Sequence, residues 1–231
     1  MATIKTGGLL EVISGKVGGQ VFAHNRAGKY VRGMSIPVNP RTTRQGVIRE
    51  AMGDAVAVWN SLTEAQRTAW SVYAAAIPYT NRVGDVFFLT AGQMFRSCWL
   101  AAKSIGVTPV TVAPAALTRP AMDPTLAATV TASTHTVSVA FDNSLAWATA
   151  VGGHLAIYMG APQAQTTNFF KGPFTYLGKI DGAVSPPTSP NAFTTLPFTV
   201  STGQKIFFKT RIILVDGRIS PEGTFRCNSV V

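Results

Sequence analysis

The spacing of apolar and polar side chains changes twice along this chain. The N-terminal part contains two short β-prone runs, 20–24 and 29–33, separated by residues 25–28. A four-residue connection that ends in glycine is typical of a β-hairpin with its glycine in the left-handed region. Pro37 and Pro40, in the segment that follows, exclude helix and favour extended backbone. We therefore expect a hairpin and then an extended strap, whose backbone needs hydrogen-bond partners from elsewhere.

From residue 43 the apolar positions follow a helical period, which predicts three helices. The first covers residues 43–61, with Thr42 or Thr43 as its N-cap. The second and third begin with similar capping sequences at 63–66 and 90–93. The positions expected in their core are Val47, Ala51, Ala55, Val58, Trp59, Leu62, Trp70, Tyr73, Met94, Phe95, Cys98, Trp99 and Ala102. Because the aromatic residues recur at core spacing, they favour a packed helical unit over a stacking platform for bases.

Residues 107–124 contain four prolines among small residues and have no helical period, which indicates a linker. Beyond this linker, apolar residues alternate with polar ones in short runs that are bounded by Gly, Pro, Asn and Asp. Runs of this length and spacing are typical of an antiparallel β-sandwich. The strands are expected at 128–134, 135–142, 153–160, 174–181, 194–200 and 204–220, with a hairpin turn at 215–218.

These elements predict an α+β fold, in which an N-terminal β-hairpin arm and a small helical unit precede an antiparallel β-sandwich. The expected division is a basic hairpin and extended arm over 1–42, a three-helix unit over 43–106, the proline-rich linker over 107–124 and the sandwich over 125–231. A chain of 231 residues is long enough to form two separate cores of this kind.

Composition indicates that few ionic groups cover the surface. Hydrophobic residues make up 46% of the chain and charged residues 13%, about half the charged share of an ordinary soluble domain. We therefore expect much of the surface to be covered by other proteins. The apolar runs are too short to span a bilayer, and residues 1–16 lack the apolar core of a signal peptide. Neither a membrane span nor export is expected.

The sequence contains no constellation of residues that predicts catalysis or a cofactor. Cys98 and Cys227 show no ligand spacing to the three histidines, so we expect buried thiols and no metal site. The glycines near Lys16 have neither the spacing of a phosphate-binding loop nor the helix that should follow one. Nucleophile motifs and paired carboxylates on one element are also missing, which favours a protein that is not an enzyme.

The net charge of +10 is concentrated in the N-terminal arm, where residues 1–50 hold eight Lys or Arg against Glu11 and Glu50. Three interpretations are open: phosphate contacts with nucleic acid, solvated charge on a hairpin, and docking on an acidic protein lattice. The proline-fixed extension and the alternation of aromatic residues with cations favour docking, because arginine and aromatic side chains anchor interfaces. The residues expected to bind a partner are Phe22, Arg26, Lys29, Tyr30, Arg32, Arg41 and Arg44.

Two parts of the chain resemble known families. Within residues 14–105 three segments follow one another: SGKVGGQVFAHNRAGKYVRGMSIPVNPRTTRQ, WNSLTEAQRTAW and LTAGQMFRSCWLA. In this order they resemble a family of uncharacterised proteins encoded by bacteriophages and prophages. Within residues 126–228 occur the runs HLAIYMG and KIFFKTRIILVDGRIS. They resemble a fibronectin type III-like or immunoglobulin-like sandwich, without the cysteine and tryptophan arrangement of antibody domains.

The first resemblance implies a virion or assembly protein. We accordingly expect a minor capsid protein, a decoration (cement) protein or a head–tail protein, which docks on the capsid lattice through its N-terminal arm. The implied partners are the major capsid protein or other virion proteins, in a homo-oligomer or a symmetric multi-copy assembly. Such a protein is made in the host cytoplasm and is located in the virion. The alternative is a phage-encoded nucleic-acid-binding protein that uses the same basic arm.

Overall fold

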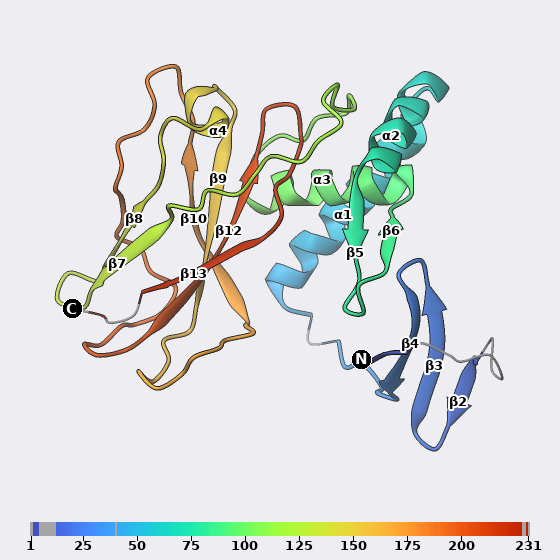
Figure 1. The fold of residues 1–231 in the computed structure, drawn as a ribbon, viewed down its shortest axis with the longest axis horizontal. Coiled ribbons are helices and arrows are strands. Elements are labelled where there is room, and N and C mark those ends of the chain that lie inside the picture. The colour runs from blue at the N-terminus through green and yellow to red at the C-terminus, as the bar shows by residue number, and fades with distance from the viewer. Residues whose placement is uncertain (1, 5–12, 40, 228–229, 231) are drawn as a thin grey trace. The chain divides into compact units, whose positions relative to one another are not determined.

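The structure is a computed structural model that describes residues 2–4, 13–39, 41–227 and 230. Helices and antiparallel sheets together form an α+β fold, as the sequence predicts (Figure 1). The chain divides into an N-terminal unit, residues 1–97 with 111–118, and a sandwich unit, residues 98–110 with 119–231. The four-part division expected from the sequence stays a prediction. Pro40, which the sequence analysis assigns to the strap, lies outside the described residues.

A four-stranded antiparallel sheet begins the N-terminal unit. Its strands are β1 (Ala2–Ile4), β2 (Gly15–Val17), β3 (Gln20–Asn25) and β4 (Gly28–Gly33), in the order β1-β4-β3-β2. The predicted hairpin is confirmed as β3 and β4. In its turn the Ala27 N–H donates a hydrogen bond to Asn25 Oδ1 at 2.9 Å. Gly28 has a φ of 116°, which is the left-handed conformation that the pattern predicts.

The three predicted helices are present as α1 (Thr43–Ser61), α2 (Glu64–Ala76) and α3 (Ala91–Ser104). The Thr42 side chain caps α1, where it accepts from the Gln45 N–H. A complete capping box, formed by Thr63 and Gln66, begins α2. The sequence analysis missed a two-stranded sheet between α2 and α3. Its strands are β5 (Pro78–Thr80) and β6 (Val86–Phe88).

Aromatic side chains form the core of the N-terminal unit, as their spacing predicts. Trp70 and Phe95 are fully buried and pack edge to face, with ring centroids 5.3 Å apart. The Trp70 indole N–H donates to the Thr111 carbonyl at 3.0 Å, so its polar atom is satisfied. The prediction for Val47 is wrong: its side chain is 50% exposed, because burial along α1 begins only at Ala51. The other expected core positions are buried or partly buried.

The sandwich unit contains two antiparallel sheets, as the period of two predicts (Figure 1). One sheet has the order β11-β8-β7 and the other the order β10-β9-β12-β13. The strands are β7 (Ala127–Thr131), β8 (Thr136–Ala140), β9 (His154–Gly160), β10 (Phe174–Asp181), β11 (Asn191–Phe193), β12 (Ile206–Ile213) and β13 (Gly223–Cys227), and a short helix, α4 (Ala146–Thr149), precedes β9. Fully buried side chains from both sheets, among them Val137, Leu155 and Phe208, form one hydrophobic core.

One predicted strand of the sandwich is wrong, and the predicted turn is confirmed. No strand forms at 194–200; the preceding residues Asn191–Phe193 pair with β8. The predicted run contains Pro197, which has no N–H to donate to a strand ladder. The turn at 215–218 is closed by a hydrogen bond from the Leu214 N–H to the Arg218 carbonyl at 2.9 Å.

Both cysteines are buried thiols that form no disulfide, as the sequence analysis expects. Burial raises the pKa of the Cys98 thiol to about 12, although the nearby guanidinium groups of Arg119 and Arg211 act in the opposite direction. The reactive thiolate therefore does not form near neutral pH, and Cys98 acts as a small apolar side chain in the core.

Candidate protein-binding surface

Residues 34–39, here named the strap, connect β4 to α1 as extended chain without regular secondary structure. At its start the Met34 N–H donates to the Gly19 carbonyl at 2.7 Å. Beyond this bond, residues 35–38 form no hydrogen bond with any other residue that the structure describes. Ile36 and Val38, at alternate positions, are 85% and 87% exposed. Extended unpaired backbone with β-branched side chains is a template for pairing with a strand of another protein.

Cations gather where the strap enters α1. Arg41 and Arg44 are exposed, and the guanidinium groups of both have no hydrogen-bond or ion-pair partner within the described part of the chain. Asn39 Oδ1 accepts from the Arg41 N–H at 3.2 Å and from Arg49 Nη2 at 2.9 Å, which fixes the turn into the helix. The first turn of α1 contains no acidic residue, although the N-terminal end of a helix carries partial positive charge. An acidic partner would neutralise this positive charge.

The register of the N-terminal sheet divides the predicted partner-binding residues between its two faces. Cross-strand partners share a face, and neighbours along a strand alternate between faces. Phe22 and Lys29 consequently lie on one face, whereas Tyr30 and Arg32 lie on the other. Lys16 of β2 shares the face of Tyr30 and Arg32. The aromatic and cationic residues that alternate in the sequence therefore do not form one continuous surface.

A cleft of about 370 Å³ lies between the β3–β4 turn and the β5–β6 hairpin. Asn81 joins these two turns, because its side-chain N–H groups donate to the Ala27 carbonyl at 2.7 Å and to the Asp85 carboxylate at 3.1 Å. Its Oδ1 accepts from the N–H groups of Val83 and Asp85, each at 2.9 Å. The lining residues are Asn25, Ala27, Gly28, Lys29, Tyr30, Thr80, Asn81, Arg82 and Phe87. They include no carboxylate.

Two of the predicted residues, Lys29 and Tyr30, line this cleft together with Arg82 and Phe87, which the sequence analysis missed. The β3–β4 hairpin and the β5–β6 hairpin thus each contribute one cation and one aromatic ring. The rings can contact an apolar group of a partner, and the cations can bind an acidic group next to it. The signal that could have found Arg82 and Phe87 is a pair of short β-prone runs around a turn with Asn and Gly, in residues 78–88.

Arg26, at the tip of the β3–β4 turn, belongs to neither the strap nor the cleft. Its side chain lines a separate hollow of about 490 Å³ beside α2 and the start of α3. The predicted set is thus distributed over the hollow, the cleft, the two sheet faces and the start of α1. In the strap and its flanks, exposed apolar side chains and exposed arginines, namely Arg32, Arg41 and Arg44, lie close together along the chain.

Other kinds of site have little support in the described residues. Among them, no cluster of His, Cys, Asp and Glu has the composition of a metal site. Within the same residues, no helix combines the length and apolar character needed to cross a bilayer. Comparison of the sequence with protein-family models gives no match, and comparison with curated proteins gives none either. The function must therefore be inferred from the chain's own residues.

Proposed function

We propose that the protein is a structural component of a bacteriophage virion, a minor capsid, decoration or head–tail protein, and that its strap docks on the capsid lattice. The observation that carries this proposal is the strap itself. It is extended, its backbone is unpaired at 35–38 within the described structure, and Ile36 and Val38 are almost fully exposed. The resemblance of residues 14–105 to phage-encoded proteins supports the virion as the setting. The role is structural and requires no catalytic group.

The energetics of the strap favour repeated weak contacts. Burying one branched apolar side chain stabilises a complex by about 1.5–3 kcal/mol. Fixing the backbone of a flexible residue costs roughly 1–2 kcal/mol, so one strap of this length binds weakly. Many copies on a symmetric shell convert such a contact into strong attachment, because each further contact forms within the same assembly. A multi-copy lattice is therefore the kind of partner that suits this segment.

Charge defines the chemistry of that partner. Arg32 precedes the strap, and Arg41 and Arg44 follow it, so cations border both ends of the apolar segment. A complementary surface has an exposed strand edge for the strap backbone and carboxylates on either side of that edge. The major capsid protein or another virion protein would provide this surface.

The sandwich supports the second resemblance. A three-stranded sheet packs with a four-stranded sheet around one core, an arrangement that fibronectin type III-like and immunoglobulin-like sandwiches also have. Many unrelated functions use such sandwiches, so the fold of this unit leaves its role in the virion open to the chemistry of its surface.

Incorporation into phage particles tests the proposal. The double substitution Ile36→Ser with Val38→Ser removes the apolar side chains of the strap but leaves all arginines. We expect this variant to fold normally and to be depleted from purified particles, as measured by quantitative mass spectrometry. Val184→Ser, at an 84% exposed position of the sandwich unit, is the matched control and should be incorporated normally. Equal incorporation of both variants would remove the strap from the proposal, and absence of the wild-type chain from particles would remove the virion role.

Nucleic-acid binding is the competing outcome, since Lys16 and Arg32 share a sheet face with the ring of Tyr30. Binding to duplex DNA is measured at low and at moderate salt, with the full chain and with a chain lacking residues 1–45. A steep loss of affinity with salt, abolished by the truncation, would assign the arm to phosphate contacts and contradict lattice docking. Weak binding that the truncation leaves unchanged is the result we expect.

A further inference from the structure

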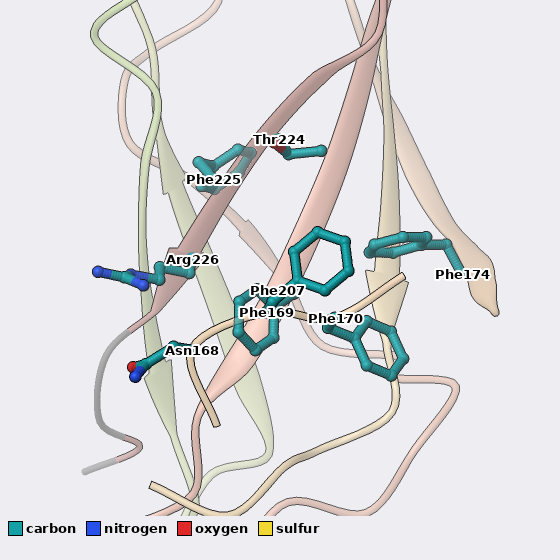
Figure 2. Close-up of a pocket in the computed structure, with 8 residues that line it drawn as sticks. All are labelled: Asn168, Phe169, Phe170, Phe174, Phe207, Thr224, Phe225 and Arg226. Atoms are coloured by element: carbon teal, nitrogen blue, oxygen red, sulfur yellow. The ribbon is translucent and has the colours of Figure 1, made fainter. Parts of the chain in front are cut away.

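An aromatic cavity of about 370 Å³ lies in the sandwich unit, at the end of the sheet where β12 begins (Figure 2). It is lined by Asn168, Phe169, Phe170, Phe174, Phe207, Thr224, Phe225 and Arg226. We propose that this aromatic cavity binds an apolar side chain with an adjoining carboxylate, presented by a segment of a partner protein. The inference does not depend on the role of the strap.

The floor of the aromatic cavity is built before any ligand arrives. Phe170 stacks on Phe207 with ring centroids 5.8 Å apart and meets Phe174 edge to face at 5.3 Å. Gly160 of β9 makes room for this arrangement, because a Cβ there would lie 2.5 Å from Cε1 of Phe170. A preformed apolar site binds more tightly, since its side chains need not be ordered on binding.

The loop that carries Asn168, Phe169 and Phe170 is tied to the sheet. The Gln163 N–H donates to the Lys205 carbonyl at 2.8 Å, and the Lys205 N–H donates back to the Gln163 carbonyl at 2.9 Å. Phe169, farther along this loop, is nevertheless 79% exposed. An exposed phenylalanine at the rim of the cavity extends the apolar contact area beyond the floor. A protein segment is long enough to cover this additional area, whereas a small free ligand is not.

The polar atoms at the rim specify an anion. Figure 2 shows Asn168 and Arg226 on the same side of the phenylalanine cluster. Neither side chain has a hydrogen-bond or ion-pair partner within the residues that the structure describes. No carboxylate lines the cavity. A guanidinium group that no carboxylate compensates, beside an apolar floor, is complementary to a carboxylate on an apolar group.

The other cations on this face of the sheet are compensated. Lys179 Nζ lies 2.6 Å from Asp181 Oδ1, and Arg211 Nη2 lies 2.8 Å from Glu222 Oε1. The register places these cations and Arg226 on the same face, away from the core. Arg226 therefore differs from its neighbours, and the difference occurs where the cavity opens.

An acidic saccharide is the competing ligand, since its carboxylate would also suit Arg226. A sugar ring needs several hydrogen bonds, however, and the polar side chains that line the cavity are only Asn168, Thr224 and Arg226. The five phenylalanines that form the rest of the lining provide no polar atom. An apolar side chain makes better use of this lining than a polyhydroxylated ring.

Titration of the full chain with small probes tests the proposal. The probes are N-acetyl-L-phenylalanine, its amide, the peptide acetyl-Gly-Gly-Gly-Phe with a free carboxylate, and glucuronate. Binding is followed by amide chemical shifts of residues 168–170 and 224–226 and by calorimetry. We expect N-acetyl-L-phenylalanine to saturate with a dissociation constant of about 1 mM, the peptide to bind several-fold more tightly, and the amide about tenfold more weakly.

Variants at exposed positions make the test specific. Arg226→Gln should weaken binding of the carboxylate probes about tenfold and leave binding of the amide unchanged. Phe169→Ala should weaken the peptide more than N-acetyl-L-phenylalanine, and Val184→Ala, exposed elsewhere on the same unit, should change nothing. Three results would each overturn the proposal: no saturable shift, equal affinity for the carboxylate and the amide, or tighter binding of glucuronate. A peptide that binds no better than N-acetyl-L-phenylalanine would overturn the assignment to a protein segment.

Discussion

The cations of the sandwich sheet and those of the strap region differ in whether a carboxylate compensates them. On the sheet β10-β9-β12-β13, Lys179 pairs with Asp181, and Arg211 pairs with Glu222. Around the strap, Arg41 and Arg44 have no such partner in the described structure. Charge that a unit compensates internally favours stability, whereas exposed uncompensated charge favours attraction of a partner. The sandwich sheet thus compensates most of its own cations, whereas the exposed arginines around the strap are what we expect of a region that, as proposed, binds another molecule.

The apolar side chains differ in the same way. In the sandwich unit, Phe208 is fully buried and stacks on Phe225 with ring centroids 5.2 Å apart. In the strap, Ile36 and Val38 face water. Buried apolar area stabilises the fold, but exposed apolar area stabilises only a complex that covers it. Substitutions in the sandwich core should therefore lower the free energy of unfolding, whereas substitutions in the strap should weaken binding of a partner.

The largest expected effect is on the sandwich core. Phe208→Ala should lower the free energy of unfolding of the sandwich unit by about 3–5 kcal/mol, because it removes buried contacts and leaves a cavity. Ile36→Ala should change the stability of the N-terminal unit by less than about 0.5 kcal/mol. Hydrogen exchange followed by mass spectrometry reports each unit separately. Similar losses of stability for the two variants would contradict the proposed difference between the sandwich core and the strap.

The second effect lies within the N-terminal unit. Asn81→Ala removes the hydrogen bonds that join the β3–β4 turn to the β5–β6 hairpin, so it should destabilise these turns by about 1–2 kcal/mol. Faster amide exchange at residues 25–33 and 80–86 is the measurement. Asn143→Ala, an exposed asparagine of the sandwich unit, is the matched control. Unchanged exchange at both turns would show that Asn81 does not hold them together.

The third effect compares charge in the two regions directly. Glu222→Gln leaves Lys209 and Arg211 without their carboxylate and should destabilise the sandwich unit by about 0.5–1 kcal/mol, less at high salt. Arg44→Gln removes a cation from the start of α1 and should stabilise the N-terminal unit by roughly 0.3 kcal/mol. Chemical denaturation at two salt concentrations measures both. A destabilising Arg44→Gln would mean that this cation has a partner inside the fold.

The smallest effect is a pH dependence at Asp181. Partial burial raises the pKa of this carboxyl, but hydrogen bonds from Lys179 and His154 outweigh burial and hold the pKa below its usual range. The ionised form therefore stabilises the native state, fully so above the unfolded pKa of about 3.9. This contribution is lost as pH falls from about 4 through the lower native pKa. Asp181→Asn should reduce the change in the free energy of unfolding of the sandwich unit over that pH range. The same pH dependence in the variant and the wild type would contradict this prediction.

Local signals explain why most of the fold was predictable. Thr63 caps α2 where the sequence places it, and α1 is capped by Thr42, one of the two threonines that the sequence offers. Capping needs only a side chain and backbone a few residues away. Gly28 takes the left-handed conformation for a similarly local reason. The failures were short strands. β5 and β6 have three residues each, so their alternation was too brief to register, and Pro197 interrupted a run that otherwise looked like a strand.

The candidate sites were less predictable than the fold. Ile36 and Arg41 belong to one continuous segment, so sequence patterning could select the strap region. Arg82 and Phe87 join Lys29 in the cleft only because two turns meet at Asn81. The aromatic cavity was not anticipated at all, since its residues come from a loop, the central strand β12 and the two edge strands β10 and β13, which span residues 168–226.

Sequence patterning alone predicts the α+β order of elements, the helix starts, the β3–β4 turn and the proline-containing strap with cations on either side, because each depends on interactions among neighbouring residues. The folded structure is needed to know which cations are compensated and how Phe170, Phe207 and Arg226 meet around one cavity. Strand register sets these relations. A turn fixes the register within a tight hairpin, but the register between strands that are distant along the chain follows from packing of the buried face.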